Sequence, residues 1–367
     1  MLHASTFRLG LATGIGMFVV PLVVSGHHSR AEFAEEILDL PAEIVEVAWR
    51  NPHPALMVRI TNEAGEEEIL RVEGWSSANT LDRQGVSGDT FEVGDQVRVA
   101  IQASRRRAGA YLGRSVLLED GTEASLGGPA FWEGADRLTA SADSSATAGG
   151  GARGLFRVWS FVDRAGGGGP NLPLTDGARA ALEGFDEARD HPLFRCEPVG
   201  MPIAMDSTLP IQFIQDGENV VMRSEQNDVT RTIHMSAGAS AEGQARTPLG
   251  YSVGRWEGNT LLVSTSRIDY PYFNDDGVPM SEAVEIVERF TLSEDEQTLD
   301  WHATVTDPQY LTAPIEMTAQ WRWVPGETIK PWNCTMWPEV RRAGAKSDDC
   351  RLTKSAAKPA YVAQTMR

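Results

Sequence analysis

Cysteine is scarce in this chain, and its spacing gives no support to one common class of metal site. Only three cysteines occur in 367 residues, and no two of them form a C-x-x-C pair. A zinc site built on thiolates is therefore not supported. In an oxidising compartment one disulfide can form. Because Cys334 and Cys350 lie close together in the sequence, we predict that pair, with Cys196 left as a buried thiol.

Positive charge is also in short supply. The chain has 33 Lys and Arg against 51 Asp and Glu, which gives a net charge of −18. A surface that acidic repels nucleic acid and anionic lipid, so we expect neither as a partner. Residues 339–367 are the exception, with seven Lys or Arg against three acidic residues, and we predict a solvated basic tail there. The content of 41% hydrophobic and 23% charged residues is typical of a globular protein.

Long apolar runs are absent beyond the first 26 residues. In that segment Arg8 is the only charged residue, and residues 9–24 are small or apolar but interrupted by glycines and Pro21. Such a run is short and glycine-rich for a membrane span and fits a secretory signal peptide, which we predict over residues 1–26. A retained membrane anchor is the alternative. Cleavage after Gly26 would make His27 the first residue and leave no stable membrane insertion.

Helical patterns are rare, and short alternating apolar runs replace them. Residues 27–128 hold five such runs and one helical interruption at residues 76–85. The predicted strands are residues 42–50, 55–61, 67–74, 95–104 and 116–121. Five short strands with one inserted helix favour a small OB-like β-barrel.

A low-complexity stretch separates this module from a second one. Residues 139–154, TASADSSATAGGGARG, have almost nothing to bury, and we predict a flexible linker over residues 129–170. Residues 171–338 predict seven or eight antiparallel strands and one helix at residues 175–188. Residues 211–225 and 251–266 are each predicted to form a hairpin of two strands. The single strands lie at residues 229–235, 283–292, 298–306 and 315–323. The fold class is therefore mainly β, with a lipocalin-like antiparallel β-barrel or meander following the OB-like barrel; an open sheet or sandwich is the alternative.

Three segments of the first module carry a family resemblance. They are HHSRAEF (residues 27–33), VAWRNPHPALMVRI (47–60) and GDQVRVAI (94–101). They resemble a family of exported bacterial proteins of unknown function, whose members show His-His-Ser near the mature start and Asn-Pro-His in the first barrel. The resemblance covers about residues 27–125. One departure from the family pattern lies directly after Ser29, at residues 30–33. It implies a periplasmic or secreted bacterial protein and carries no activity.

The second module has a resemblance of its own. Residues 248–265, PLGYSVGRWEGNTLLVST, and residues 287–308, VERFTLSEDEQTLDWHATVTDP, resemble a region that accompanies such domains in other exported bacterial proteins. This region is also of unknown function, so the resemblance implies location and fold rather than chemistry.

The histidines around the predicted mature start are candidate metal ligands. If His27 is the first residue, its amine and imidazole can chelate one ion, and His53 can complete a T-shaped set of three nitrogens, with His28 as a further ligand. Such nitrogen ligands suit copper above zinc, so copper is the one cofactor that we predict. In the alternative interpretation, His27 and His28 are simply the polar start of the mature chain and His53 is a turn residue.

Catalytic motifs give little support for an enzyme. GYSVG, residues 250–254, has the G-x-S-x-G spacing, but a strand follows it where a helix is needed, so Ser252 is not predicted to be a nucleophile. We therefore favour an exported protein that binds a small molecule without catalysis. The alternatives are a copper-dependent oxidoreductase of the histidine-brace type and a barrel enzyme that uses Glu288 as acid or base.

Two charged residues fall on apolar strand faces in the second module. Arg231 alternates with Ile233, and Glu288 alternates with Ile286 and Phe290. Because a lone buried charge is costly, we expect the two charges to pair with each other or to meet a ligand. The first interpretation is a structural ion pair across the barrel. In the second, they line a cavity for a small apolar or amphipathic ligand, together with Trp301, Trp321 and Trp323.

Overall fold

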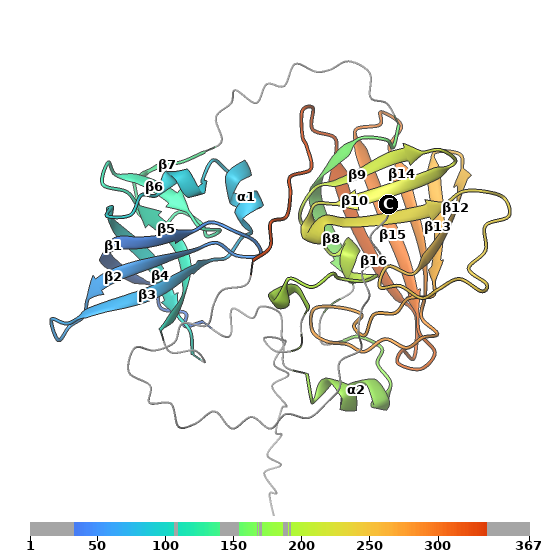
Figure 1. Cartoon of the computed structure of the whole chain (residues 1–367), viewed down its shortest axis with the longest axis horizontal. Helices are drawn as coiled ribbons and strands as arrows, with labels where there is room; N and C mark the ends of the chain where they lie inside the picture. Colours follow the sequence, from blue (N-terminus) through green and yellow to red (C-terminus); the bar gives the residue numbers. More distant parts are fainter. Residues whose placement is uncertain are drawn as a thin grey trace, which may run out of the picture. The chain divides into compact units, whose positions relative to one another are not determined.

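The computed structural model describes residues 33–105, 109–139, 154–166, 168, 171–185, 190 and 192–335. These residues form a mainly β protein with two closed barrels (Figure 1). The predicted signal peptide, His27, His28, Cys350 and the basic tail lie outside the described residues. No helix in the described part of the chain is long and apolar enough to cross a membrane.

The first barrel has five strands and the topology of an OB fold. Strand β1 pairs with both β2 and β4, and the parallel pairing of β3 with β5 closes the barrel. A short helix, α1, separates β3 from β4 and begins where the Ser77 side chain accepts a hydrogen bond from the Thr80 backbone N–H. The predicted OB-like barrel is confirmed. Its elements are β1 (Leu38–Ala48), β2 (Ala55–Thr61), β3 (Glu67–Gly74), α1 (Ala78–Arg83), β4 (Gln96–Ala103) and β5 (Ala110–Leu117), extended by β6 (Thr122–Ser125) and β7 (Asp136–Arg137).

The end of this module differs from the prediction. The expected strand at residues 116–121 is the end of β5 followed by a turn, and a further strand, β6, comes after it. The first part of β5 was missed because Gly113 and Arg114 interrupt its apolar alternation. A side chain at position 113 would lie 2.7 Å from both Val72 and Leu126, so glycine permits the close packing of this strand.

The second barrel has nine strands and is closed, which decides against an open sheet or a sandwich. Its strand order is β10-β11-β12-β13-β14-β15-β16-β8-β9. All neighbours are antiparallel except β11 and β12, which pair in parallel. The strands are β8 (Val158–Gly166), β9 (Ile211–Asp216), β10 (Asn219–Ser224), β11 (Val229–His234), β12 (Tyr251–Glu257), β13 (Thr260–Ser266), β14 (Glu285–Leu292), β15 (Thr298–Thr306) and β16 (Ile315–Arg322).

Strand β8 lies inside the range predicted as a flexible linker, and that part of the linker prediction is wrong. Its first residues supply an apolar anchor, because Trp159 is completely buried in the barrel core. Its last five residues are exposed, so the alternation that marks a strand is absent from the sequence there. Backbone pairing with β16 on one side and β9 on the other holds β8 in the sheet.

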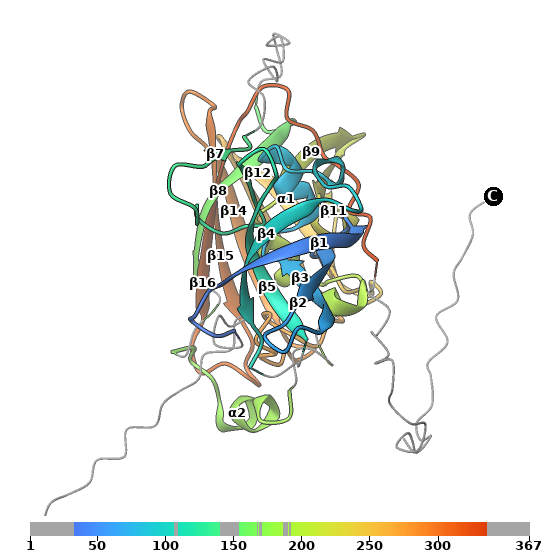
Figure 2. The same cartoon turned by 90° about the vertical axis from the view of Figure 1, so that its left-hand side faces the viewer.

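Loops close one end of the second barrel. Helix α2 (Asp176–Leu182), shorter than predicted, lies beyond that end in both views (Figures 1 and 2). The loops contribute buried apolar side chains, among them Ile203, Tyr270 and Phe273, to the same core as the strands. The barrel interior is therefore continuous with a packed apolar base.

The disulfide joins Cys196 to Cys334 rather than Cys334 to Cys350, so the predicted pairing is wrong. The two bonded cysteines are 138 residues apart in the sequence, but their Cα atoms are 5.6 Å apart. After β16 the chain runs back to the first barrel, where Cys334 forms a β-bridge with Asn51. Closeness in sequence was a poor guide because this returning segment brings distant parts of the chain together.

Candidate functional site

A buried polar network crosses the interior of the second barrel. Arg231 on β11 is 2% exposed and Glu288 on β14 is completely buried, and the guanidinium forms two hydrogen bonds with the carboxylate. The Arg231 Nη1 to Glu288 Oε1 distance is 3.0 Å. The expected burial and pairing of these two charges, inferred from strand phase alone, are confirmed.

Three more side chains complete the network, each from a different strand. Arg231 Nε donates to Ser252 Oγ on β12 at 2.9 Å, and Nη2 donates to Thr265 Oγ1 on β13 at 2.6 Å. Trp301 Nε1 on β15 donates to Glu288 Oε1 at 3.1 Å. One residue from each of the five consecutive strands β11 to β15 therefore takes part. Because both charges are held by protein groups, this geometry supports the structural interpretation of the pair.

The network spans a sparsely paired part of the barrel wall. Strands β11 and β12 share only two paired positions, Ile233 with Ser252 and His234 with Val253. Gly254 permits their close approach, because a side chain there would lie 2.6 Å from Ile233 and from Met235. The bond from Arg231 to Ser252 thus joins two strands that have little backbone pairing of their own.

The other two predicted site residues lie outside this network. Trp321 is completely buried, and its indole N–H has no hydrogen-bond partner among the described residues. Trp323 follows the end of β16 and is half-buried, with the Arg157 guanidinium 4.8 Å from its ring centroid. The same guanidinium lies 4.5 Å from the Trp159 ring, so Arg157 is held between two indoles. This cation–π arrangement was not predicted from the sequence, because Arg157 and Trp159 both lie inside the range predicted as a flexible linker.

Of the predicted metal ligands, only His53 lies in the described part of the chain. It is half-buried and follows the Asn51-Pro52 peptide just before β2. Within the described residues, no three His, Cys, Asp or Glu side chains are grouped so that they could hold a metal ion.

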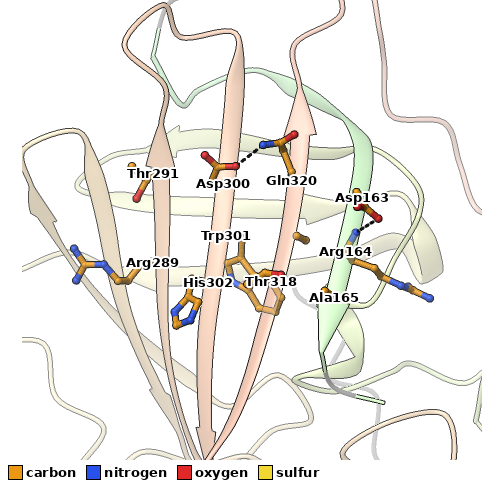
Figure 3. Close-up of a pocket in the computed structure, with 11 residues that line it drawn as sticks. Asp163, Arg164, Ala165, Arg289, Thr291, Asp300, Trp301, His302, Thr318 and Gln320 are labelled. Atoms are coloured by element: carbon orange, nitrogen blue, oxygen red, sulfur yellow. Dashed lines mark hydrogen bonds between the residues drawn. The ribbon is translucent and has the colours of Figure 1, made fainter. Parts of the chain in front are cut away.

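A hollow of about 570 Å³ lies on the outer wall of the second barrel. Four adjacent strands line it, namely β14, β15, β16 and β8 (Figure 3). Sheet register places its side chains in two rows across these strands: Arg289, His302, Thr318 and Ala165 in one, and Thr291, Asp300, Gln320 and Asp163 in the other. His302 points outward into the hollow. Small side chains at Ala165 and Thr318 leave the space open.

Charges of both signs border this hollow. Arg289 stands on one side, and Asp163 and Arg164 stand on the other (Figure 3). Between them Gln320 Nε2 donates to Asp300 Oδ1 at 2.7 Å. Arg289 is about half exposed, and its nearest carboxylate oxygen, on Glu257, is 3.7 Å away. Its guanidinium therefore keeps N–H donors directed at solvent, where an anionic ligand group can bind.

The fold and the buried network define a two-barrel β protein, in which an OB-type domain precedes a nine-stranded barrel. Residues 17–113, which include most of the first barrel, match the model of a family of unknown function, DUF6152. A search of curated proteins found no sequence that matches this chain. The comparison thus agrees with the resemblance of the first module and leaves the second module uncharacterised.

Single substitutions in the buried pair should destabilise the protein strongly. Arg231→Met or Glu288→Met leaves the partner charge buried and unpaired, so we expect each to lower the free energy of unfolding by about 3–5 kcal/mol. The double variant should lose much less, because no charge is then stranded. Urea unfolding measures these differences. Arg255→Met, which breaks an exposed ion pair with Glu257, is the matched control and should change stability by less than about 1 kcal/mol. Single variants as stable as that control would contradict a structural ion pair.

Proposed function

We propose that this protein is an exported bacterial binding protein whose second barrel holds a small polar ligand in its outer hollow. The proposal rests on one observation: the hollow has the volume of a small-molecule site and carries charged side chains on both sides. Its volume of about 570 Å³ falls in the range of small-molecule sites, about 300–1,000 Å³. Its walls offer a cation on one side and a carboxylate on the other.

The outer hollow is favoured over the barrel interior as the ligand site. Inside the barrel, Trp159, Trp321, Phe213 and Phe290 are all buried in one core cluster, and the polar network is bound to protein groups. A ligand there would have to displace these contacts. In the hollow, Arg289 lies 3.7 Å from Glu257 and Asp163 accepts one bond from the Arg164 backbone N–H, but both side chains are exposed enough to form further bonds.

The arrangement of charges favours a ligand that is both anionic and cationic. Arg289 on β14 and Asp163 on β8 are separated by three strand spacings, which is about 14 Å between the backbones. In the structure the Arg289 side chain is directed away from Asp163, toward Glu257 on β12 (Figure 3), so it must turn back across β14 to shorten the gap between the charged groups. A zwitterion with its carboxylate at Arg289 and its ammonium group at Asp163 would satisfy both ends. Because the site is open to water, we expect binding that weakens as salt is added.

The ligand class can be tested with 6-aminohexanoate. We expect it to bind, whereas hexanoate and hexylammonium, which each lack one charge, should bind at least about tenfold more weakly if one charged contact contributes about 1.4 kcal/mol. Isothermal titration and amide chemical shifts of β14 and β8 measure this. Arg289→Ala should abolish the preference for the zwitterion, and Arg223→Ala, an exposed arginine on β10, is the matched control. Equal affinity for all three compounds would contradict the proposed ligand class.

We also propose that the mature N-terminus binds copper with His53. One feature of the described chain supports this. The backbone around His53 is fixed, because Gly74 N–H donates to Pro54 O at 2.8 Å and the preceding Asn51 is hydrogen-bonded. Five residues lie between His27 and Phe33, so the six residue steps can span at most about 20 Å. In the proposed site the amine and imidazole of His27 bind the ion together with the fixed imidazole of His53.

Copper binding should depend on both the amine and His53. We expect His53→Ala to weaken Cu(II) binding strongly, and one residue added before His27 to do the same, because the amine is then displaced from the ion. His28→Ala should have the smaller effect. Competition titration with a chromophoric chelator measures the affinity. Unchanged affinity in both the His53 variant and the extended protein would contradict the site.

Export should remove the first 26 residues. The apolar segment before His27 fits a signal peptide, so the intact mass of protein recovered from the periplasm should correspond to a chain that starts at His27. The mass of the whole-cell precursor serves as the reference. A periplasmic chain that still carries Met1 would show that the segment is a membrane anchor and would also remove the proposed copper ligand.

A further inference from the structure

The chain that follows the second barrel returns to the first barrel and docks on it. We call residues 327–335 the strap. Asn51 and Cys334 form a parallel β-bridge, and the Thr335 N–H donates to the Asn51 carbonyl at 3.1 Å. The strap thus runs beside the start of the Asn51-Pro52-His53 turn as an added piece of extended chain.

Side chains of the first barrel bind the carbonyl groups of the strap. Asn51 Nδ2 donates to Trp332 O, and Asn79 Nδ2 donates to Pro331 O at 3.1 Å. Arg83 Nη2 donates to Thr328 O at 3.1 Å. These three donors, from the turn before β2 and from α1, contact main-chain atoms of the strap. Such contacts recognise an extended backbone whatever its side chains are.

Acidic side chains beyond β10 bind the N–H groups of the strap. Glu225 Oε2 accepts from Lys330 N at 2.8 Å, and Asp228 Oδ1 accepts from Trp332 N at 3.1 Å. The protein therefore binds both the N–H donors and the carbonyl acceptors of the strap's main chain. A segment bound only by apolar packing would not need this pattern.

The groove that receives the strap is held in place by its own hydrogen bonds. Glu225 is completely buried and accepts two bonds from Arg83, at 2.7 and 2.6 Å, and one from Asn79 at 2.9 Å. Asn51 Nδ2 donates to Asn79 Oδ1 at 3.0 Å. These bonds hold the recognising side chains in place without any contribution from the strap. A preorganised site of this kind loses less ordering entropy when a peptide binds.

We propose that Asn51, Asn79, Arg83, Glu225 and Asp228 form a recognition groove for extended peptides, which the chain fills with its own strap. The strap defines the peptide class by two further contacts. Glu327 Oε1 accepts from Arg83 Nε at 3.1 Å, and Trp332 is 4% exposed. The groove therefore takes a peptide with a carboxylate side chain five residues before a buried tryptophan. This peptide site shares no residue with the hollow or with the proposed copper site, although Asn51 lies two residues before His53.

The disulfide holds the strap in the groove. Cys334 belongs to the strap and is bonded to Cys196. A tethered strap has a high effective concentration at the groove, so a free peptide cannot compete until the tether is cut. The test must therefore release the strap first.

The experiment uses the folded full-length protein with a protease site inserted between Gly326 and Glu327. After cleavage, reduction of the disulfide and removal of the released fragment, a fluorescent peptide of residues 327–335 with Ser in place of Cys334 is added. We expect saturable binding by fluorescence anisotropy. Asn51→Ala and Asn79→Ala should each weaken it by at least about tenfold, since each loses at least one buried hydrogen bond and strands its partner. Asn62→Ala, in an exposed turn, is the matched control and should bind like the parent.

Two results would overturn the proposal. In the first, the cleaved protein keeps its thermal unfolding transition but binds the peptide no more tightly than it binds a scrambled version of the peptide. The other comes from uncut protein carrying Cys334→Ser, which tests the groove even if cleavage unfolds the chain. There Asn79→Ala should increase proteolysis of the strap relative to Asn62→Ala, and equal proteolysis of the two variants would show that the groove does not hold it.

Discussion

The second barrel depends on a buried charge pair that ties together five of its nine strands. Backbone hydrogen bonds alone leave β11 and β12 joined at only two positions, and parallel pairing is slightly weaker per residue than antiparallel pairing. Arg231 compensates from within, because its fork of N–H donors reaches β12, β13 and β14 from β11. Burying a guanidinium is costly, so the arrangement is tolerable only because Glu288, Ser252 and Thr265 all accept its bonds. Closure of the barrel and satisfaction of this charge are therefore one physical requirement.

The same network fixes the wall that carries the outer hollow. Trp301 points inward and donates to Glu288, while its sequence neighbours Asp300 and His302 point outward into the hollow. A strand held from inside presents its outward side chains at fixed positions, which is the condition that binding groups need. The ligand site proposed on this sheet would need no moving loop. The inner ion pair would then serve binding indirectly, as a support for β14 and β15, even though it touches no ligand.

The sequence predicted those features that depend on local periodicity. Strict alternation from Ile315 to Trp321 identified β16, and the same phase argument placed Arg231 and Glu288 inside the barrel. It failed where a strand lacks alternation, as in the exposed second half of β8. It also failed where distant segments meet. Asn51 and Trp332, which share a hydrogen bond, are 281 residues apart, and nothing local in the sequence marks that contact.

The outer hollow shows a different limit of sequence reasoning. Its Asp, Thr, His and Gln side chains occupy the polar phase of their strands, where ordinary solvated residues also lie. What distinguishes them is register across four strands, and register is a property of the folded sheet. The charge of Arg289 gave no signal for the same reason. A polar residue at an inward-facing strand position stands out in the sequence. A polar residue at an outward-facing position looks like any other surface residue, so a candidate binding role becomes visible only in the folded sheet.

The Asn-Pro-His turn shows that one motif can have a structural role that its sequence does not indicate. From the sequence, the motif is a family signature, and only its histidine was a candidate site residue. In the structure Asn51 is 1% exposed, and its amide binds Asn79 and the strap while its carbonyl accepts from Thr335. An asparagine with both its side chain and its backbone engaged in this way is explained by the groove alone. The fixed position of His53 then follows from the anchoring of Asn51, so any metal site there would use a rigidity that the strap and α1 already require.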